Sequence, residues 1–517
     1  MLVPALLALL APCAGAAADD PQANPPGTPN VLILYADDLG YGDVGATNPA
    51  SKIPTPHLDR LAAEGLTFTD AHSSSGICTP SRYALLTGRH HWRDFHGIVN
   101  SFGGSVFEDG QVTLASLLKE NGYRTACIGK WHLGWDWEAI RNPAVGPLGK
   151  GRQKGLPPEA FDWSKPIPGG PLAVGFDRYF GDTVINFPPY AWIEDDRVTQ
   201  APTVMKDEST WPPIKEGNWE CRPGPMVEGW NPYDVLPTLA DRGVQYLQEQ
   251  AEADEPFFLY FAFPSPHAPI IPNDKFDGAS QAGPYGDFVH ETDHVVGRLL
   301  AALEESGQAA NTLVVFTADN GPERYAYARE QAFDHWSAAP FRGLKRDIHE
   351  GGHHVPFFVR WPGVTEPGAT TDALTSQVDL FATIAEATGA ALPPNAAAAE
   401  GARYQDSVSL MPVLKGAPTS GRTTIVQNTN PNAYAFRQGD RLLINAKTGH
   451  HSGVDPKWLE KHDTPREQGD VHLYNLAEDV GQQRDLAAER PDETAEMQAA
   501  LQRARRPIPR VLTPTGR

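Results

Sequence analysis

Four apolar runs, each followed directly by polar residues, constrain the fold of this chain more than any other feature. The runs are NVLILYADDLG (30–40), RTACIGKWHLG (124–134), PFFLYFAFPSPHAP (256–269) and NTLVVFTADNG (311–321). Strands that are apolar throughout are covered on both faces, as they are in parallel sheets. Helical patterns separate the runs, for example in 55–66, 113–123 and 293–307. This alternation predicts an α/β fold with a large mixed, mostly parallel sheet sandwiched by helices.

The polar residues that follow these runs are expected to meet at one edge of the sheet. They are Asp37, Asp38, Lys130, His132, His267, Asp319 and Asn320. Each motif alone has an ordinary structural explanation, such as a helix cap for DDLG or a turn for DNG. In an open parallel sheet, however, ligands bind at the carboxyl ends of the strands. Polar residues follow all four runs at equivalent positions, and this repetition predicts an active site at that edge.

The residue types suit a metal ion and an oxyanion. Asp37, Asp38, Asp319 and Asn320 offer oxygen ligands, which suit Ca²⁺ or Mg²⁺ better than zinc. The candidate cationic donors are Arg82, Lys130, His132 and His267, with Lys345 and Arg342 from FRGLKRDIHEGG (341–352) as further candidates. Taken alone, Lys345 would be a solvated surface lysine. Together these residues describe a pocket in which charge develops on a tetrahedral oxyanion as an ester breaks.

Length and charge exclude some classes of protein. The chain has 517 residues, which favours two domains, one large and one small. Its net charge of −21 argues against a nucleic-acid partner, because a phosphate backbone needs a basic face. An anionic substrate would therefore require a local cationic pocket.

The N-terminal segment 1–18, MLVPALLALLAPCAGAAA, has the form of a secretory signal peptide, although no Lys or Arg precedes its apolar run. Anchoring as a lipoprotein through Cys13 is disfavoured, because Pro12 stands where a small residue is expected. No later stretch reaches about 18 uninterrupted apolar residues, so stable membrane insertion is not expected. We expect an exported protein, periplasmic or secreted.

The cysteines beyond the signal segment are Cys78, Cys127 and Cys221. They are too few and too scattered for a disulfide scaffold or a zinc cluster. Cys127, in TACIG, is most simply a small buried apolar residue, and a Cys127–Cys221 bridge remains an open alternative.

Cys78 begins the most specific motif. CTPSRYALLTGR (78–89) resembles the C-x-P-x-R…LLTGR signature of the type I sulfatases, and GYRTACIGKWHLG (122–134) resembles their second signature. DDLG, PHAP, DNG and RGLK…EGG also occur in the order found in that family. The resemblance spans nearly the whole mature chain. It is strongest to bacterial carbohydrate and aryl sulfatases of the alkaline phosphatase superfamily.

The resemblance implies a modified residue and a mechanism. A maturation enzyme would oxidise Cys78 to Cα-formylglycine, whose hydrate attacks sulfur and then ejects sulfate through its second hydroxyl. The implied metal ligands are Asp37, Asp38, modified Cys78, Asp319 and Asn320, with Ca²⁺ favoured over Mg²⁺. The implied catalytic residues are Cys78 itself, Arg82 and Lys130, which fix the hydrate, His132, which deprotonates it, and His267 and Lys345, which protonate the leaving alcohol.

We expect the catalytic domain to cover 28–415 and a small domain with an antiparallel sheet to cover 416–517. Short strands are predicted in 422–428, 433–446 and 471–479, with a hairpin turn at Gln438–Asp440, and a closing helix in 492–506.

Two insertions, 141–171 and 185–232, carry Trp163, Trp192, Trp211, Trp219 and Trp230. These tryptophans either stack on sugar rings over the cleft or anchor long loops to the body. The spacing in RHHWRDFH (89–96) and HEGGHH (349–354) is not credible for zinc, and these stretches provide either subsite residues or surface loops.

The expected substrate is a sulfated mono-, oligo- or polysaccharide. One alternative is a phosphoester or phosphonate hydrolase of the same superfamily, in which a Thr or Ser nucleophile and a histidine-rich two-zinc site are expected. The other is a carbohydrate-binding homologue in which Cys78 is never oxidised.

Overall fold

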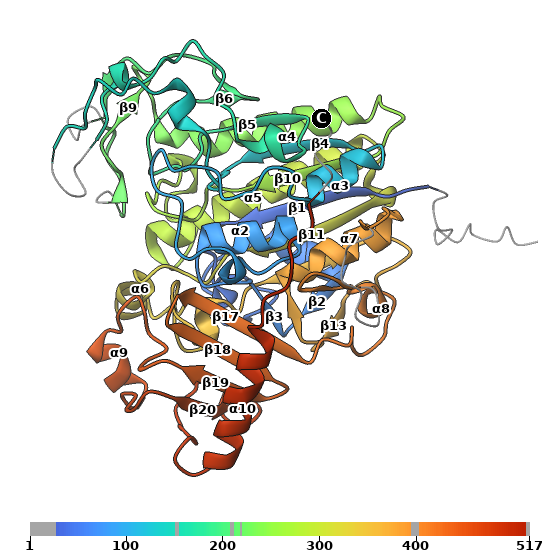
Figure 1. The fold of residues 1–517 in the computed structure, drawn as a ribbon, viewed down its shortest axis with the longest axis vertical. Coiled ribbons are helices and arrows are strands. Elements are labelled where there is room, and N and C mark those ends of the chain that lie inside the picture. The colour runs from blue at the N-terminus through green and yellow to red at the C-terminus, as the bar shows by residue number, and fades with distance from the viewer. Residues whose placement is uncertain (1–26, 150–154, 207–210, 218–219, 394–402, 513–517) are drawn as a thin grey trace, which may run out of the picture.

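The large sheet has ten strands and carries helices on both faces (Figure 1). The computed structural model describes residues 27–149, 155–206, 211–217, 220–393 and 403–512. The expected signal segment 1–18, with Cys13, and Trp219 lie outside the described residues. The strand order is β13-β2-β12-β11-β1-β10-β4-β5-β6-β7.

The four apolar runs form the adjacent central strands of this sheet. β11 (Thr312–Ala318), β1 (Asn30–Ala36), β10 (Phe257–Ala262) and β4 (Arg124–Gly129) are all parallel, and β5 (Arg178–Gly181) continues them. The flanking strands β12 (Phe357–Arg360), β2 (Leu66–Phe68), β13 (Ala369–Thr371), β6 (Ile193–Glu194) and β7 (Arg197–Val198) include antiparallel pairs. The predicted mixed, mostly parallel sheet is confirmed.

Alternate residues of each central strand enter two different cores. In β1, Val31 and Ile33 pack with α2 (Cys78–Thr87), α3 (Leu114–Glu120) and α7 (Leu380–Thr388). Leu32 and Leu34 pack on the other face with α1 (Pro56–Ala63), α4 (Val235–Gln250) and α5 (Gly283–Glu305). Because side chains alternate across a strand, a strand covered on both faces must be apolar at every position.

Shorter elements complete the large unit. They are β3 (Ala71–His72), β8 (Val204–Met205), β9 (Pro225–Met226), β14 (Thr375–Ser376), β15 (Arg403–Tyr404), β16 (Ser407–Val408), α6 (Ala326–Phe333) and α8 (Met411–Leu414). Among the described residues, no helix is both long enough and apolar enough to cross a membrane.

A smaller antiparallel sheet forms the C-terminal unit, at the bottom of Figure 1. Its strands are β17 (Thr424–Asn430), β18 (Ala433–Gln438), β19 (Arg441–Asn445) and β20 (His472–Asn475), accompanied by α9 (Pro456–Lys461) and α10 (Pro491–Ala504). The β18–β19 turn contains Gly439 at φ +55°, a conformation that favours glycine. The predicted strands and closing helix are therefore present.

The edge of the small sheet holds the loop that leads into α2. Gln427 Nε2 donates a hydrogen bond to the Ser73 carbonyl at 2.7 Å, and Ser75 Oγ donates to the Asn428 carbonyl at 2.7 Å. The C-terminal unit thus fixes the backbone just before Cys78.

A partly buried ionic cluster joins the two units beside this loop. The Asp70 carboxylate accepts hydrogen bonds from Arg437 at 2.6 and 2.8 Å and lies 2.9 Å from His72 Nε2. Burial alone would raise the pKa of Asp70, but the His72 hydrogen bond and the charges of His72 and Arg437 lower it to about 2. The carboxylate is therefore stabilised in its ionised form by folding.

We predict that Asp70→Asn lowers the free energy of unfolding by about 2 kcal/mol at pH 7, because the pKa of Asp70 falls on folding. A depressed pKa contributes stability above the unfolded value of 3.8 and loses it as the pH falls towards about 2. Urea unfolding at pH 7, 4 and 2.5 should therefore show the difference between wild type and variant shrinking below pH 4. Asp254→Asn, at an exposed position, is the matched control. A difference that is the same at all three pH values would contradict this account.

Candidate active site

The polar residues that follow the four apolar runs lie together at the carboxyl edge of the central strands, as the sequence predicted. Asp37 and Asp38 follow β1, Lys130 follows β4, and Asp319 and Asn320 follow β11. His267 lies in the loop after β10. One potential ligand atom from each of Asp37, Asp38, Cys78 and His267 lies within 4.8 Å of the others.

One half of the site is built around Arg82 and Lys130. Arg82 is fully buried and places Nε and Nη2 each 2.9 Å from Asp319 Oδ2, with Nη2 also 3.8 Å from Asp37 Oδ1. Lys130 Nζ donates to Asp37 Oδ2, and Arg82 Nη1 donates to the Lys130 carbonyl at 2.9 Å. Each buried charge therefore has a partner of opposite sign.

The other half is built around Asp38. Its carboxylate accepts hydrogen bonds from Lys345 Nζ and from Asn320 Nδ2, both at 2.8 Å. His267 Nε2 lies 3.7 Å from Asp38 Oδ2. Asp38 has a φ of +63°, an unusual backbone conformation for a non-glycine residue and one that aspartate tolerates better than most.

The oxygen atoms of this edge suit a divalent cation. Asp37 Oδ1 and Asn320 Oδ1 are buried without a hydrogen-bond partner. Burial, followed by the charge of Asp37, raises the pKa of Asp319 to about 6. The site would therefore gain from additional positive charge, and Asp37, Asp38, Asp319 and Asn320 could hold a metal ion through oxygen.

Cys78 is the first residue of α2, and Arg82 lies one turn later on the same side of the helix. Only 2% of Cys78 is exposed, and burial raises the pKa of its thiol to about 12. An unmodified Cys78 is consequently protonated at neutral pH and is a poor nucleophile. Cys78, Cys127 and Cys221 are all free and buried, so the structure contains no Cys127–Cys221 bridge.

The environment of His132 leaves one ring nitrogen available as a base. Its Nε2 lies 3.0 Å from the Val99 carbonyl, which can only accept, so Nε2 carries the proton. The other nitrogen, Nδ1, is buried without a partner. Burial and the charges of Lys130 and Arg82 hold the pKa of His132 well below its ordinary value, so the ring is neutral.

His267 and Lys345 differ in charge. Burial and the charge of Lys345 lower the pKa of His267 to about 3, so the imidazole is neutral. Burial would lower the pKa of Lys345, but the adjacent Asp38 carboxylate raises it well above the ordinary value. Lys345 is therefore the group of this pair that carries a proton to donate.

Arg342, the further cationic candidate, does not reach the site. Its Nε lies 2.9 Å from His450 Nε2, and its Nη1 donates to the Gln482 carbonyl at 2.7 Å. The chain turns at Gly343, where φ is +95°, and Arg342 faces the C-terminal unit while Lys345 faces Asp38.

The two histidine-rich stretches also serve the junction between the units. His349 lies near His450 and Glu467, whereas His353 and His354 lie near His72 and Glu350. Both groups contain an arginine at hydrogen-bond distance from a histidine, Arg342 in the first and Arg437 in the second. These guanidinium groups supply the positive charge that a metal would otherwise bring, so we interpret both as buried ionic networks.

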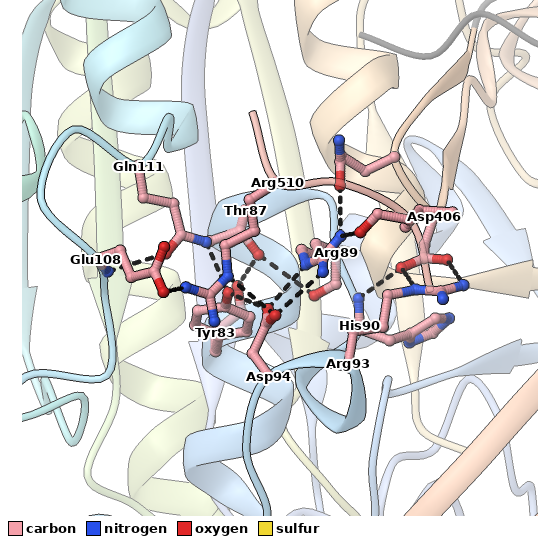
Figure 2. A network of polar contacts seen from close by, with 12 residues as sticks. Tyr83, Thr87, Arg89, His90, Arg93, Asp94, Glu108, Gln111, Asp406 and Arg510 are labelled. Carbon is pink, nitrogen blue, oxygen red and sulfur yellow. Dashed lines mark hydrogen bonds and ion pairs between the residues drawn. The ribbon is translucent and has the colours of Figure 1, made fainter. Parts of the chain in front are cut away.

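The stretch RHHWRDFH (89–96) follows α2 and is anchored by ion pairs. Figure 2 shows Arg89, the last signature residue, bound through Nε to Asp94 Oδ2 at 2.8 Å, and Arg93 bound through Nε to Asp406 Oδ2 at 2.7 Å. Arg510, from the C-terminal segment, binds Asp94 Oδ1 at 2.9 Å. Trp92 packs in the core of the C-terminal unit. The segment around Arg510 is thus bound to the residues that follow α2.

The insertion tryptophans that the structure describes pack against the body. Trp211 and Trp230 are buried, and Trp192 lies with its ring centroid 4.9 Å from that of Phe180 and 5.0 Å from that of Trp230. Trp163 lies 4.9 Å from Phe161, measured between ring centroids. These contacts favour the anchoring role.

Three residues near the pocket were not identified from the sequence. Glu323 Oε2 lies 3.6 Å from Lys345 Nζ, and both of its oxygens lie 2.8 Å from Arg346 Nη1. Glu220 accepts a hydrogen bond from Tyr325 Oη at 2.9 Å. Glu323 and Arg346 could have been found from the sequence, because they adjoin the DNG and RGLK motifs. Glu220 could not, because it lies in an insertion without a recognisable pattern.

Comparisons with known proteins identify the family of the chain. The sequence profile of the Sulfatase family matches residues 29–390. The N-acetylgalactosamine-6-O-sulfatase of Bacteroides thetaiotaomicron is 30% identical over 510 residues, covering 92% of this chain and 92% of that protein. Arylsulfatase A of Homo sapiens is 33% identical over 506 residues, covering 92% and 86%. A solved sulfatase structure, from work on glycosaminoglycan metabolism by Bacteroides thetaiotaomicron, has a TM-score of 0.74 and 28% identity, covering 92% of this chain and 99% of that one. The chain therefore belongs to the sulfatase family and is a sulfuric ester hydrolase.

Proposed function

We propose that this protein removes sulfate from a sulfated carbohydrate, using formylglycine derived from Cys78 and a divalent metal, Ca²⁺ in preference to Mg²⁺. The sugar specificity is supported by the N-acetylgalactosamine-6-O-sulfatase relative, whose similarity covers nearly the whole chain. The substrate class is a sulfated mono-, oligo- or polysaccharide. Export, guided by segment 1–18, and oxidation by a separate maturation enzyme are parts of the same proposal.

The observation that carries the proposal is the charge balance around Cys78. Asp37, Asp38 and Asp319 are buried with Arg82, Lys130 and Lys345, so their charges cancel. A divalent cation bound by the carboxylates would leave the pocket with surplus positive charge. A sulfate ester is an anion, and such a pocket stabilises both the bound ester and the charge that develops on its oxygens.

Two absent groups would supply part of the chemistry. A metal held by Asp37, Asp38, Asp319 and Asn320 would act as a Lewis acid toward sulfate oxygens. Formylglycine at position 78 would supply, as its hydrate, the attacking oxygen and the second hydroxyl needed for release.

The residues of the chain itself orient the reactants and move protons. Arg82 and Lys130 hold Asp319, Asp37 and the start of α2 in place. His132 Nδ1 is the free base that accepts a proton from position 78. His267 and Lys345 form the pair that binds the sulfate and protonates the departing alcohol oxygen as the S–O bond to the sugar breaks, and Lys345 is the one of the two that carries positive charge before the ester binds.

Cys78 decides between an enzyme and an unmatured binding homologue. We expect the peptide containing Cys78 to be lighter by about 18 Da than its unmodified mass, because oxidation to formylglycine exchanges the thiol for an aldehyde. The same preparation should release sulfate from at least one member of a panel of sulfated sugars, and Cys78→Ala should release none. A modified chain that cleaves no sulfated sugar would end the carbohydrate proposal. An intact Cys78 thiol together with an absence of turnover would favour the carbohydrate-binding homologue.

Metal binding should depend on Asp319. At about 100 times its dissociation constant, Ca²⁺ should stabilise the wild type by about 2.7 kcal/mol, which is a rise of a few degrees in Tm. Asp319→Asn keeps a partner for Arg82 but removes the charge, so it should fold and lose the Ca²⁺-dependent rise. Asp254→Asn should behave as the wild type. A full rise in Asp319→Asn would show that the metal lies elsewhere.

The proton-donor role of Lys345 predicts a dependence on the leaving group. Lys345→Ala should lower kcat/KM for a sugar sulfate by about 10²- to 10⁴-fold. The loss should be much smaller for an aryl sulfate whose phenol is acidic, because that group leaves without a proton. Steady-state kinetics with both substrates measures this. Equal losses would assign Lys345 to binding rather than to protonation.

A further inference from the structure

We propose that a cavity beside His132 binds the sugar that adjoins the sulfated one in an oligosaccharide, and that Arg141 and Arg222 in this cavity select an anionic group, a carboxylate or a sulfate, on that second sugar. This inference rests on the proposed function, because it concerns the carbohydrate that carries the ester. It narrows the substrate class from any sulfated sugar to acidic oligosaccharides.

Two adjoining cavities lie next to His132. The smaller one is lined by His132 itself. The larger one has a volume of about 660 Å³, which is within the range of ligand pockets in proteins. The two cavities share five lining residues, which are Asn100, Ser101, Phe102, Trp137 and Pro188. The larger cavity therefore begins next to the residue that we propose as the base.

Hydrogen bonds fix these cavities relative to Cys78. Thr79, the residue after Cys78, donates through Oγ1 to the His132 carbonyl at 2.8 Å, and the same oxygen accepts from the Val99 N–H at 3.2 Å. His132 Nε2 in turn donates to the Val99 carbonyl at 3.0 Å. The wall formed by residues 99–103 is therefore held next to the start of α2.

A row of three side chains leads from the sulfate pocket to Arg222. The ring centroid of Phe187 lies 5.6 Å from that of His132. The guanidinium carbon of Arg222 lies 3.7 Å from the centroid of the same Phe187 ring, and Arg222 Nη1 donates to Asn100 Oδ1 at 3.1 Å. Arg222 is therefore separated from His132 by one six-membered ring, which is also the size of one sugar unit. This spacing suits the neighbouring sugar rather than the sulfated one.

The charged groups of the larger cavity favour an anion. Arg141 and Arg222 line it, and Glu138 is the one carboxylate among the described lining residues. Arg141 donates to three backbone carbonyls, which are uncharged and leave its positive charge uncompensated: those of Asn142, Val145 and Ala160. Two cations against one carboxylate give a local positive surplus in a chain whose net charge is −21. An anionic sugar needs such a surplus to bind.

The same cavity has an aromatic wall. Phe102, Trp137 and Phe161 line it, and the ring centroid of Phe102 lies 5.3 Å from that of Trp137 and 4.5 Å from that of Phe161. Trp137 and Phe161 are buried, whereas Phe102 is only half-buried. Aromatic rings with a few well-placed polar groups are typical of small-ligand sites. A sugar ring, with its apolar face and polar edge, matches this combination.

Unusual backbone conformations are concentrated around the smaller cavity. Phe102, His132 and Thr183 all line it, and their φ values are +58°, +55° and +64°. Residues other than glycine rarely adopt such values, and when they do they cluster at functional sites. Trp135 Nε1 and Ser101 Oγ, from two further lining residues, are buried without a hydrogen-bond partner among the described residues. These observations favour a binding role over simple packing.

The test starts from the sulfated sugar that matured wild type cleaves best in the panel. A neutral hexose is attached through each free hydroxyl of this sugar in turn, and the disaccharide with the highest kcat/KM is kept. Two acidic forms of it are then made, with a carboxylate or a sulfate at C6 of the added hexose, and loss of sulfate from the first sugar is followed by chromatography. We expect kcat/KM for at least one acidic form to exceed that of the neutral form by about tenfold, because hydrogen bonds to a charged group are stronger. The preferred form identifies the anion.

Arg222→Met keeps the length of the side chain and removes its charge. We expect it to reduce the preference for the acidic disaccharide by about tenfold, mainly through KM, because the contact is remote from the breaking bond. Arg141→Met should reduce the preference in the same sense. Phe102→Leu removes only aromatic surface, so it should lower kcat/KM about threefold for the neutral and acidic disaccharides alike. Arg484→Met, at an exposed position in the C-terminal unit, should leave the preference unchanged.

The outcomes separate the two proposals. Absence of turnover by matured wild type on every sulfated sugar overturns the proposed function and the second-sugar site with it. Turnover of the single sugar but of none of the disaccharides overturns the second-sugar site alone. Equal kcat/KM for the neutral and both acidic disaccharides does the same, as does an unchanged preference in both arginine variants. If neither variant folds, the wild-type preference is measured at about 0.05 and 0.5 M NaCl, where screening should reduce it. A preference that salt does not change then overturns the site.

Discussion

Burial of three carboxylates against three cations at one edge of the large sheet is the constraint on which the rest of this structure depends. Charges removed from water are costly unless each has a close partner. Here Arg82 bridges Asp319 and Asp37, and Lys345 binds Asp38. The six charged groups come from five separate segments of the chain. The pairing therefore fixes those segments relative to one another as well as the charges themselves.

The second sheet has a direct part in this arrangement. Gln427 and Asn428 on its edge strand hold the backbone at Ser73 and Ser75, just ahead of Cys78. The C-terminal segment contacts the residues that follow α2 and binds Asp94 through Arg510 (Figure 2). Cys78 is the first residue of α2, and its position depends on contacts on both sides of the helix start. The C-terminal unit supplies one side and the large sheet the other.

The pocket residues follow core strands, where packing on both faces leaves little room for movement. Glu220 instead comes from an insertion, and insertions vary in length and sequence at small cost to the core. Changes in this insertion can therefore be accommodated without disturbing Asp37, Arg82 or Asp319.

The sequence by itself determined the central strands, the polar residues after them and the small antiparallel sheet. It could do so because a strand covered on both faces is apolar at every position, and its end is marked by the first charge. Only the tertiary structure decided that Lys345 reaches the pocket while Arg342 turns away, that the histidine-rich stretches pair across the domain junction, and that Glu220 lies beside Glu323. These outcomes depend on contacts between distant segments, which local periodicity does not encode.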